Sequence, residues 1–219
     1  MNMISGKNVR YIEDGDLFNS NADVLVNSVN IKGIMGAGIA REFKKKFPEM
    51  YKEYSKACKR GEVYVLARFE VDLKEPKKPK LIVHEVYDWK PHIWVGERDG
   101  KKFIVLNFPT KIYWDLPSDY KIIEAGLKWL RDNIDLLSEK LGRKVRKIAM
   151  PQIGTGYGYL EWEKVKSLIE RYLSNIDVEV EVYLNYSKSK SKKIPKNTSE
   201  KKSEHKKLKD RRITDFINS

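Results

Sequence analysis

The sequence predicts an α/β domain in which helices cover a mixed β-sheet. Short apolar runs typical of buried strands alternate with helical stretches from the start of the chain. Two glycine-rich loops, at residues 33–38 and 154–158, each follow an expected strand and precede an expected helix. The 219 residues are enough for one well-packed domain with appendages, and we expect this domain to span residues 1–186.

The N-terminal elements are two short strands followed by two helices. Residues 9–12 and 24–26 are expected to be buried strands, each followed by polar turn residues. The first glycine-rich loop then opens a helix that runs to about Phe47. Pro48 separates this helix from a second one, which continues to about Lys59.

An irregular segment lies between the next two expected strands, residues 63–71 and 103–108. It contains several prolines, and its Asp99–Gly100 pair favours a hairpin turn. We therefore expect an inserted hairpin at the edge of the sheet, spanning about residues 74–102.

The C-terminal elements alternate between helix and strand. Ser118 is the expected N-cap of a helix whose apolar residues recur at i, i+4, i+7 and i+11. A strand at residues 147–150 leads into the second glycine-rich loop, and a further helix follows. In the last strand, valines at positions 178, 180 and 182 alternate with Glu179 and Glu181, which is typical of a half-exposed strand.

The positive charge is concentrated at the C-terminal end of the chain. The protein contains 44 Lys and Arg against 31 Asp and Glu, a formal net charge of +13. From Ser187 onward there are 12 basic and 4 acidic residues, so this tail contributes +8 of the total. Its Ser/Lys-rich composition cannot bury a core, so residues 187–219 are predicted to be disordered. We expect DNA contact through this tail and the mildly basic surface of the domain.

The composition also disfavours several classes of function. Cys58, the only cysteine, lies at an expected helix end and is predicted to be an unreactive thiol in a reducing compartment. The three histidines lack metal-ligand spacing, so neither a metal nor another cofactor is expected. No apolar run approaches the ~20 residues that cross a bilayer, and no secretory signal is visible, so we expect a cytoplasmic protein without membrane contact. The Lys- and Glu-rich composition leans towards a thermophilic source.

The two glycine-rich loops can hold a ligand that contains two phosphates. Glycine permits close approach of the backbone, and the N-terminus of a helix favours an anion. Neither loop is a Walker A motif, and neither has the full dinucleotide-binding spacing. Each loop taken alone is compatible with a simple tight turn.

Four ordered motifs resemble those of macrodomains. They are residues 15–17 (Gly-Asp-Leu), 26–30 (Val-Asn-Ser-Val-Asn), 35–40 (Met-Gly-Ala-Gly-Ile-Ala) and 151–156 (Pro-Gln-Ile-Gly-Thr-Gly). The resemblance covers roughly residues 9–186 and implies a macrodomain-type sheet that binds ADP-ribose.

Two further motifs resemble particular branches of this family. Residues 107–111 (Asn-Phe-Pro-Thr-Lys) and 123–127 (Ile-Glu-Ala-Gly-Leu) are similar to the antitoxin branch that removes ADP-ribose from DNA. Residues 43–47 (Phe-Lys-Lys-Lys-Phe), with the Gly-Ala-Gly-Ile-Ala run, are shared with the terminal ADP-ribose-protein glycohydrolase branch.

The resemblance implies an ADP-ribose site built from several loops. Asp16, beside Leu17, would accept a hydrogen bond from the adenine amino group, and Asn30 would face the distal ribose. Asn27 is a further expected contact, although it more naturally holds the strand end. The remaining expected contacts come from the two glycine-rich loops, the segment before Lys111 and the end of the last strand: Gly36, Ala37, Gly38, Ile39, Ala40, Pro109, Thr110, Gly154, Thr155, Gly156, Tyr157, Gly158 and Tyr186.

Each of these assignments has a structural alternative. Asp16 could cap a helical turn, and the asparagines could be local turn formers. Tyr186 could stack on adenine or simply pack against the domain.

Lys111 is the expected catalytic residue. In a lysine-rich chain most lysines are solvated surface charges, but the resemblance associates this position with attack on the anomeric carbon of the ribose. Attack requires a neutral amine, and an unperturbed lysine with a pKa of ~10.4 is almost entirely charged at neutral pH. Burial would lower this pKa, whereas a bound diphosphate would raise it. The alternative is a charged Lys111 that stabilises the leaving group while water attacks.

Gly158 departs from the pattern of the protein-directed branch. That branch carries an acidic residue at this position, where it resolves the covalent intermediate. A glycine here favours the DNA-directed branch, or a reader that binds ADP-ribose with little turnover.

The end of the tail resembles a sliding-clamp-binding motif. Ile213, Phe216 and Ile217 supply the apolar spacing of such a motif within residues 210–217. The match is partial, because Asp210 stands where glutamine is usual and Ile217 replaces an aromatic residue. The alternative is a frayed amphipathic end.

Three functional hypotheses follow. The first is an ADP-ribosyl hydrolase that acts on DNA through Lys111. The second is a non-catalytic ADP-ribose reader. The third is a hydrolase of protein-linked ADP-ribose, acylated ADP-ribose or ADP-ribose 1″-phosphate.

Overall fold

Parallel strands make up most of the main sheet. A computed structural model describes residues 8–72, 74 and 80–184. Within them, a six-stranded sheet has the order β1 (Val9–Ile12), β8 (Glu179–Tyr183), β7 (Lys147–Pro151), β2 (Val24–Asn30), β6 (Lys101–Lys111) and β5 (His92–Arg98). All neighbouring pairs are parallel except β5 and β6. The predicted tail at residues 187–219, its clamp-binding motif and Tyr186 lie outside the described residues.

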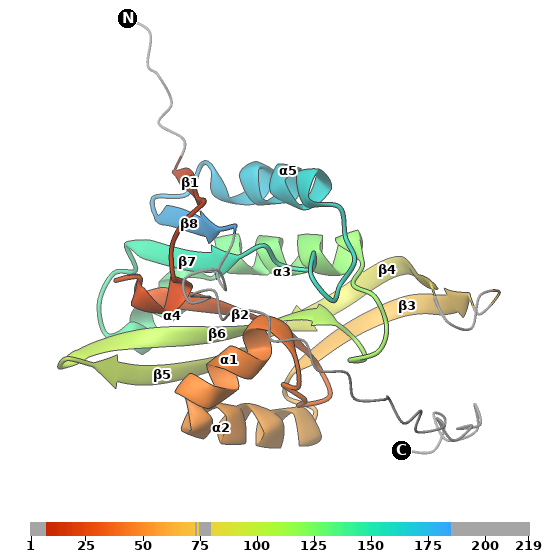
Figure 1. Ribbon diagram of the computed structural model, residues 1–219, viewed down its shortest axis with the longest axis horizontal. Helices are drawn as coiled ribbons and strands as arrows, with labels where there is room; N and C mark the ends of the chain where they lie inside the picture. Colours follow the sequence, from red (N-terminus) through yellow and green to blue (C-terminus); the bar gives the residue numbers. More distant parts are fainter. Residues whose placement is uncertain (1–7, 73, 75–79, 185–219) are drawn as a thin grey trace, which may run out of the picture.

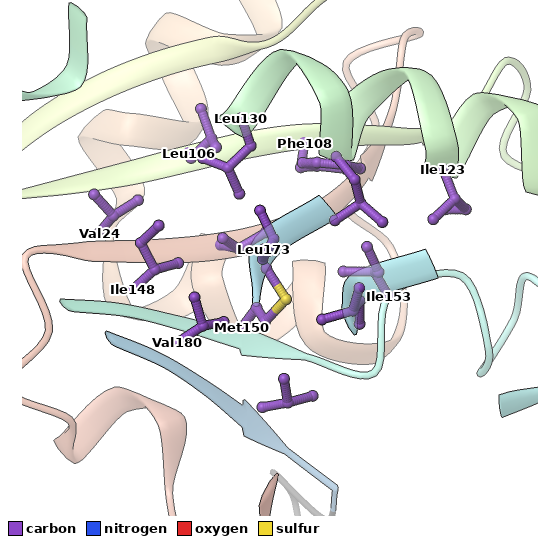
Figure 2. Close-up of a cluster of buried hydrophobic side chains, with 14 of the residues drawn as sticks. Val24, Leu106, Phe108, Ile123, Leu130, Ile148, Met150, Ile153, Leu173 and Val180 are labelled. Atoms are coloured by element: carbon purple, nitrogen blue, oxygen red, sulfur yellow. The ribbon is translucent and has the colours of Figure 1, made fainter. Parts of the chain in front are cut away.

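Helices cover both faces of this sheet (Figure 1). The short helix η1 (Leu17–Asn19), α1 (Gly38–Lys46) and α2 (Pro48–Lys59) bury their apolar residues in one core. Helices α3 (Tyr120–Asp132), α4 (Ile134–Leu141) and α5 (Trp162–Leu173) contribute to the other. Figure 2 shows this second core, where Leu106 and Ile148 of the sheet lie near Leu130 and Leu173 of the helices. The predicted α/β architecture, in which helices cover a mixed sheet, is confirmed.

A separate two-stranded sheet extends beside α3 (Figure 1). It consists of β3 (Tyr64–Asp72) and β4 (Lys80–Lys90), which pair antiparallel. The Lys121 ammonium of α3 donates to the carbonyls of Val83 and His84 at 2.9 and 2.8 Å. The predicted edge hairpin is present as β5 and β6, with Asp99 and Gly100 at its turn. The first part of the predicted insertion instead forms β4 of the separate sheet.

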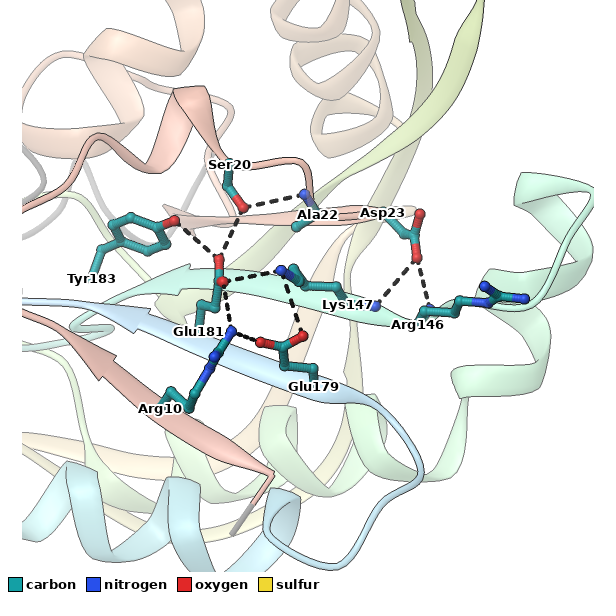
Figure 3. Close-up of polar contacts among 9 residues, drawn as sticks. All are labelled: Arg10, Ser20, Ala22, Asp23, Arg146, Lys147, Glu179, Glu181 and Tyr183. Atoms are coloured by element: carbon teal, nitrogen blue, oxygen red, sulfur yellow. Dashed lines mark hydrogen bonds and ion pairs between the residues drawn. The ribbon is translucent and has the colours of Figure 1, made fainter. Parts of the chain in front are cut away.

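The last strand differs from its expected half-exposed state. Strand β1 pairs with the outer edge of β8, so β8 is an interior strand. Glu181 is only 7% exposed, because polar side chains cover its face of the strand. Its carboxylate accepts from Lys147, Ser20 and Tyr183 at 3.2, 3.1 and 3.0 Å, and it also pairs with Arg10 (Figure 3). Burial alone would raise the pKa of the Glu181 carboxyl, but the hydrogen bonds from Lys147, Tyr183 and Ser20 outweigh it and lower that pKa.

The predicted helix break at Pro48 is confirmed, whereas the predicted N-cap of α3 is wrong. Asp119 is the N-cap, and its carboxylate accepts from the Lys121 N–H at 2.8 Å. The Ser118 hydroxyl is buried and has no hydrogen-bond partner within the described part of the chain. The helix begins one residue later than expected because two adjacent residues can both act as caps.

Strand β2 is longer than the predicted residues 24–26. It continues to Asn30 through two polar residues, because each finds a partner on β6. Asn27 donates to the Asn107 side chain at 2.8 Å, and the Ser28 and Thr110 hydroxyls are also 2.8 Å apart. In the described ranges, no helix is both long and apolar enough to cross a membrane.

Candidate functional site

The carboxyl ends of five parallel strands meet at one edge of the main sheet. The chain leaves β2 towards the side of β6 but leaves β7 towards β8, so the direction of connection reverses between these two neighbours. In open α/β sheets, ligands bind where the connections diverge in this way. Both glycine-rich loops begin at this point, one after β2 and one after β7. The topology therefore places the predicted loops side by side.

Asn30 shapes the first glycine-rich loop. Its side-chain oxygen accepts from the Lys32 N–H at 2.8 Å, and its amide nitrogen donates to the Ile34 carbonyl at 2.6 Å. The side chain thus folds the loop back on the end of β2, as the local turn-forming alternative expected. Its contact with the distal ribose stays a prediction.

The start of α1 presents main-chain N–H groups at the same edge. Its N-cap, Ala37, provides no side-chain hydrogen bond, and Gly38 has a φ of 56°, a left-handed conformation that favours glycine. Gly36 and Ala37 are exposed, whereas Ile39 and Ala40 are buried in the core. The last two can therefore contact a ligand mainly through their backbone.

Asn27 lies inside the domain rather than at its surface. Its side chain is fully buried, and it pairs with Asn107 in register across β2 and β6. Asn107 also donates to the His92 Nδ1 atom at 3.0 Å. Burial lowers the pKa of His92 to about 4, so the imidazole is neutral and its Nδ1 can accept. This chain of side chains supports the expected role of Asn27 in holding the strand.

Pro109 and Thr110 also face inward. The Thr110 hydroxyl contacts the hydroxyl of Ser28, and the Pro109 carbonyl accepts from the Trp89 indole at 3.0 Å. Both residues hold the end of β6 against its neighbours. Their direct contact with a ligand stays a prediction.

Lys111 ends β6 directly opposite Asn30. A register shift between Val29 and Asn30 brings these two residues into pairing. The Lys111 ammonium donates to the Tyr157 carbonyl of the second glycine-rich loop. Burial lowers the pKa of Lys111, while the nearby Asp115 carboxylate acts in the opposite direction. The expected catalytic lysine thus lies between the end of β2 and the second loop.

The second glycine-rich loop is tightly closed on itself. Gly154 has a φ of 74°, and its carbonyl accepts from the Leu160 N–H at 3.1 Å. Gly158 is buried, and a Cβ there would overlap with the Gly154 carbonyl and the Ser118 hydroxyl. The Ser118 N–H also donates to the Gly158 carbonyl at 3.0 Å. This loop conformation has no room for an acidic side chain at position 158.

Three other predicted contacts in this loop have different environments. The Thr155 hydroxyl donates to the Gln152 carbonyl at 2.9 Å, which fixes the turn. Gly156 has open space at its Cβ position, and Tyr157 is 63% exposed. Their backbone and side chains stay available at the surface of the edge.

Asp16 follows β1 at the same edge. One oxygen of its carboxylate accepts from the Phe18 N–H at 3.0 Å, so Asp16 caps η1. Leu17 is fully buried and contributes at most its backbone. Asp16 therefore acts as a cap, as the structural alternative expected. The predicted contact with adenine would use the hydrogen-bonding capacity of the carboxylate that capping leaves free.

Sequence reasoning missed several residues near this edge. Asn107 belongs to a recognised motif, but nothing in that motif signals its pairing with Asn27. Tyr159 and Trp114 are 76% and 58% exposed, and no periodic pattern marks them.

Burial raises the pKa of Cys58 to about 11, so its thiol is a weak nucleophile at neutral pH, as predicted.

A separate hollow lies at the opposite edge, near the amino ends of β7 and β8. It is lined by charged residues that include Arg10, Lys144, Asp177 and Glu179. These four residues pair with one another as Arg10–Glu179 and Lys144–Asp177. Their charges are satisfied internally, and the predicted ligand residues lie at the other edge of the sheet.

The fold and the glycine-rich edge define the class of the protein. The sequence matches the Macro domain family over residues 26–93. The macrodomain of Thermus aquaticus DarG is 35% identical, with a TM-score of 0.59, and the match covers 80% of this chain and 97% of that one. The chain belongs to the macrodomain family.

Two further relatives carry informative names. A Mycobacterium tuberculosis protein named DNA ADP-ribosyl glycohydrolase is 38% identical over 170 residues, which are 77% of this chain and 40% of that protein. Thermosipho africanus DarTG, solved in complex with ADP-ribose, is 32% identical with a TM-score of 0.60, over 87% of this chain and 44% of that one. This chain therefore spans less than half the length of both proteins.

Proposed function

We propose that this protein is an ADP-ribosyl glycohydrolase that removes ADP-ribose from a modified macromolecule, with ADP-ribosylated DNA as its substrate. One observation carries the proposal. Lys111 and Asn30 pair at the carboxyl ends of β6 and β2, and the Lys111 ammonium reaches the second glycine-rich loop. A half-buried amine thus lies where the two glycine-rich loops converge.

The loops supply the groups that ADP-ribose requires. N–H groups at the start of α1 would bind one phosphate, and the 154–157 backbone would bind the other. Asp16, after β1, would accept a hydrogen bond from adenine, which places the adenosine on the β1 side of the edge. The distal ribose would then lie towards β6, between Asn30 and Lys111.

Two routes are compatible with this placement of Lys111. In the first, the neutral amine attacks the anomeric carbon as the glycosidic bond breaks. The leaving base takes the bonding electron pair and a proton, and water later releases ADP-ribose from the lysine. In the second, the charged ammonium stabilises the leaving group while water attacks directly.

Two features support DNA as the substrate. The most informative relatives are named as DNA ADP-ribosyl glycohydrolases. In addition, the closed second loop excludes an acidic side chain at position 158, where the protein-directed branch is expected to carry one.

The test is release of ADP-ribose from a single-stranded oligonucleotide that carries one modified base. We expect wild type to release it and Lys111→Ala to be slower on the order of 10³-fold, with ADP-ribose binding retained. Lys101→Ala, at the opposite end of β6, is the matched control and should behave as wild type. If wild type and Lys111→Ala both bound ADP-ribose and neither released it from DNA, the proposal would be wrong. The protein would then be a non-catalytic reader or would act on another conjugate, such as protein-linked ADP-ribose.

The pH profile separates the two routes. Because burial lowers the pKa of Lys111, the neutral fraction grows as the pH rises through that lowered value. Attack by the amine predicts a release rate that increases about tenfold per pH unit and then levels off. Stabilisation by the ammonium instead predicts a release rate that is level below this pKa and falls about tenfold per pH unit above it. A covalent adduct on Lys111, detected by mass spectrometry after reduction, would accompany only the first route.

A further inference from the structure

Large aromatic side chains are exposed in the loops around Lys111. Trp114 is 58% exposed, Tyr157 63% and Tyr159 76%. Isolated exposed apolar residues need no explanation, but an exposed apolar group beside a candidate site indicates a binding surface. We call these three residues the aromatic rim.

Contacts with Lys111 hold Tyr157 and Tyr159 beside it, and Trp114 follows Lys111 closely in the chain. The Tyr157 carbonyl accepts from the Lys111 ammonium, which also lies 5.9 Å from the centre of the Tyr159 ring. Trp114 is three residues beyond Lys111 on the chain. A hydrogen bond of 3.0 Å from the Ser118 N–H to the Gly158 carbonyl ties the Trp114 loop to the tyrosine loop.

Backbone geometry keeps Tyr159 at the surface. Its φ is 60°, a left-handed conformation that costs a non-glycine residue on the order of 1 kcal/mol or more. The Tyr159 N–H donates to the Gly156 carbonyl at 3.1 Å, and the next residue is tied to Gly154. The turn therefore holds the Tyr159 backbone at the surface, and its side chain is exposed there.

We infer that the aromatic rim stacks on the unpaired nucleobases that flank the modified nucleotide in single-stranded DNA. This inference rests on the proposed function and specifies the form of its substrate. Base–aromatic stacking tolerates any sequence because every base has a π-face. In a duplex, neighbouring base pairs cover those faces, so the rim can engage only unpaired bases.

The charge around the rim suits a polyanion. The Lys32 ammonium lies 4.5 Å from the centre of the Tyr113 ring, on the flank of the same loop. The Asp115 carboxylate is an opposing charge near Lys111, whereas the whole chain carries a formal net charge of +13. The rim would thus supply stacking, while lysines supply contacts to the phosphates.

The experiment compares two substrates that carry the same modified base. One is a single-stranded oligonucleotide with the modification at its centre, and the other is the modified mononucleoside. We expect Trp114→Ala and Tyr159→Ala each to lower kcat/KM on the oligonucleotide about tenfold, the equivalent of ~1.4 kcal/mol of stacking, with no change on the mononucleoside. Trp114→Phe should keep most of the wild-type rate, because it keeps a ring.

Tyr87 provides a matched control. It is 57% exposed on β4, outside the loops around Lys111, so Tyr87→Ala should change neither rate. An equal loss on both substrates would overturn the inference, because the rim would then act on ADP-ribose or on the loop itself. Unchanged rates on both substrates would overturn it as well.

A binding measurement separates this inference from the proposed function. The probe is an unmodified single-stranded oligonucleotide, titrated at raised salt to weaken the contacts of the basic tail. Weaker binding by Trp114→Ala and Tyr159→Ala would support stacking by the rim, even if wild type released no ADP-ribose from DNA. If both variants bound the oligonucleotide as tightly as wild type, the stacking inference would be wrong, even if release were observed.

Discussion

Lys147 and Lys111 lie at opposite ends of the two strands that flank β2, and their surroundings differ. Lys147 begins β7, where its ammonium is 3.2 Å from Glu181 and 3.5 Å from Glu179 (Figure 3). Lys111 ends β6, where its ammonium donates to the Tyr157 carbonyl. The first lysine is one member of an ion-pair network, whereas the second is half-buried against a neutral group.

This difference indicates which lysine is available for chemistry. A buried ammonium that is paired with carboxylates gains enough to offset the loss of water, and its role is structural. A buried ammonium with weaker interactions with carboxylates instead has a lowered pKa, as Lys111 does. The two edges of the sheet therefore differ: the amino edge carries an ion-pair network that stabilises the fold, and the carboxyl edge carries the proposed site.

The strongest test of this division is to exchange each lysine for methionine and compare stability. We expect Lys147→Met to lower the free energy of unfolding by about 3 kcal/mol, because it leaves the buried Glu181 carboxylate short of a cation. Lys111→Met should change it by less than about 0.5 kcal/mol, because no carboxylate loses an ion pair. Urea unfolding midpoints at constant m-value measure both.

A double variant is the control for the Lys147 result. Glu181→Gln removes the stranded charge, so Lys147→Met/Glu181→Gln should be more stable than Lys147→Met alone. If Lys111→Met were the more destabilising of the two single variants, the division between the edges would be wrong.

The second test compares two glycines of the second loop. Gly158→Ala should destabilise the protein by about 2 kcal/mol, because its Cβ would overlap with the Gly154 carbonyl and the Ser118 hydroxyl. Gly156→Ala should be nearly neutral, because that position opens onto free space. We also expect Gly158→Ala to weaken ADP-ribose binding in calorimetry, because it displaces the loop that would hold a phosphate. A stable Gly158→Asp variant with normal binding would show that the loop can accept the acidic residue of the other branch.

Local patterns in the sequence predicted most of the fold, and the errors arose where pairing is non-local. The helix break at Pro48 and the Asp99–Gly100 turn follow from backbone preferences of single residues, and both were right. The alternation of Glu179 and Glu181 was misleading. Whether the polar face of an alternating strand is exposed depends on what covers that face, and here Ser20, far away in the sequence, reaches the Glu181 carboxylate together with Lys147.

The site shows a similar limit. Motif resemblance selects Asp16, Asn30 and Lys111, and the parallel strands bring all three to one edge, while their roles stay predictions. It did not predict that Asn27 and Asn107 pair inside the sheet, because register is set by the packing of whole strands. Nor did it predict the exposure of Tyr159, which depends on how the second loop closes.

The smallest expected effect concerns the start of α3, directly after the loop that follows Lys111. Asp119→Ala should lower the free energy of unfolding by about 1 kcal/mol, because it removes the cap from the Lys121 N–H. Ser118→Ala should change it by less than about 0.5 kcal/mol, because the Ser118 hydroxyl has no hydrogen-bond partner among the described residues. Urea unfolding of the two variants side by side makes the comparison. A larger loss for Ser118→Ala would mean that its hydroxyl, and not the Asp119 carboxylate, anchors the loop between Lys111 and α3. Because the Ser118 N–H that holds Gly158 belongs to the backbone, neither substitution should slow release of ADP-ribose as Lys111→Ala does.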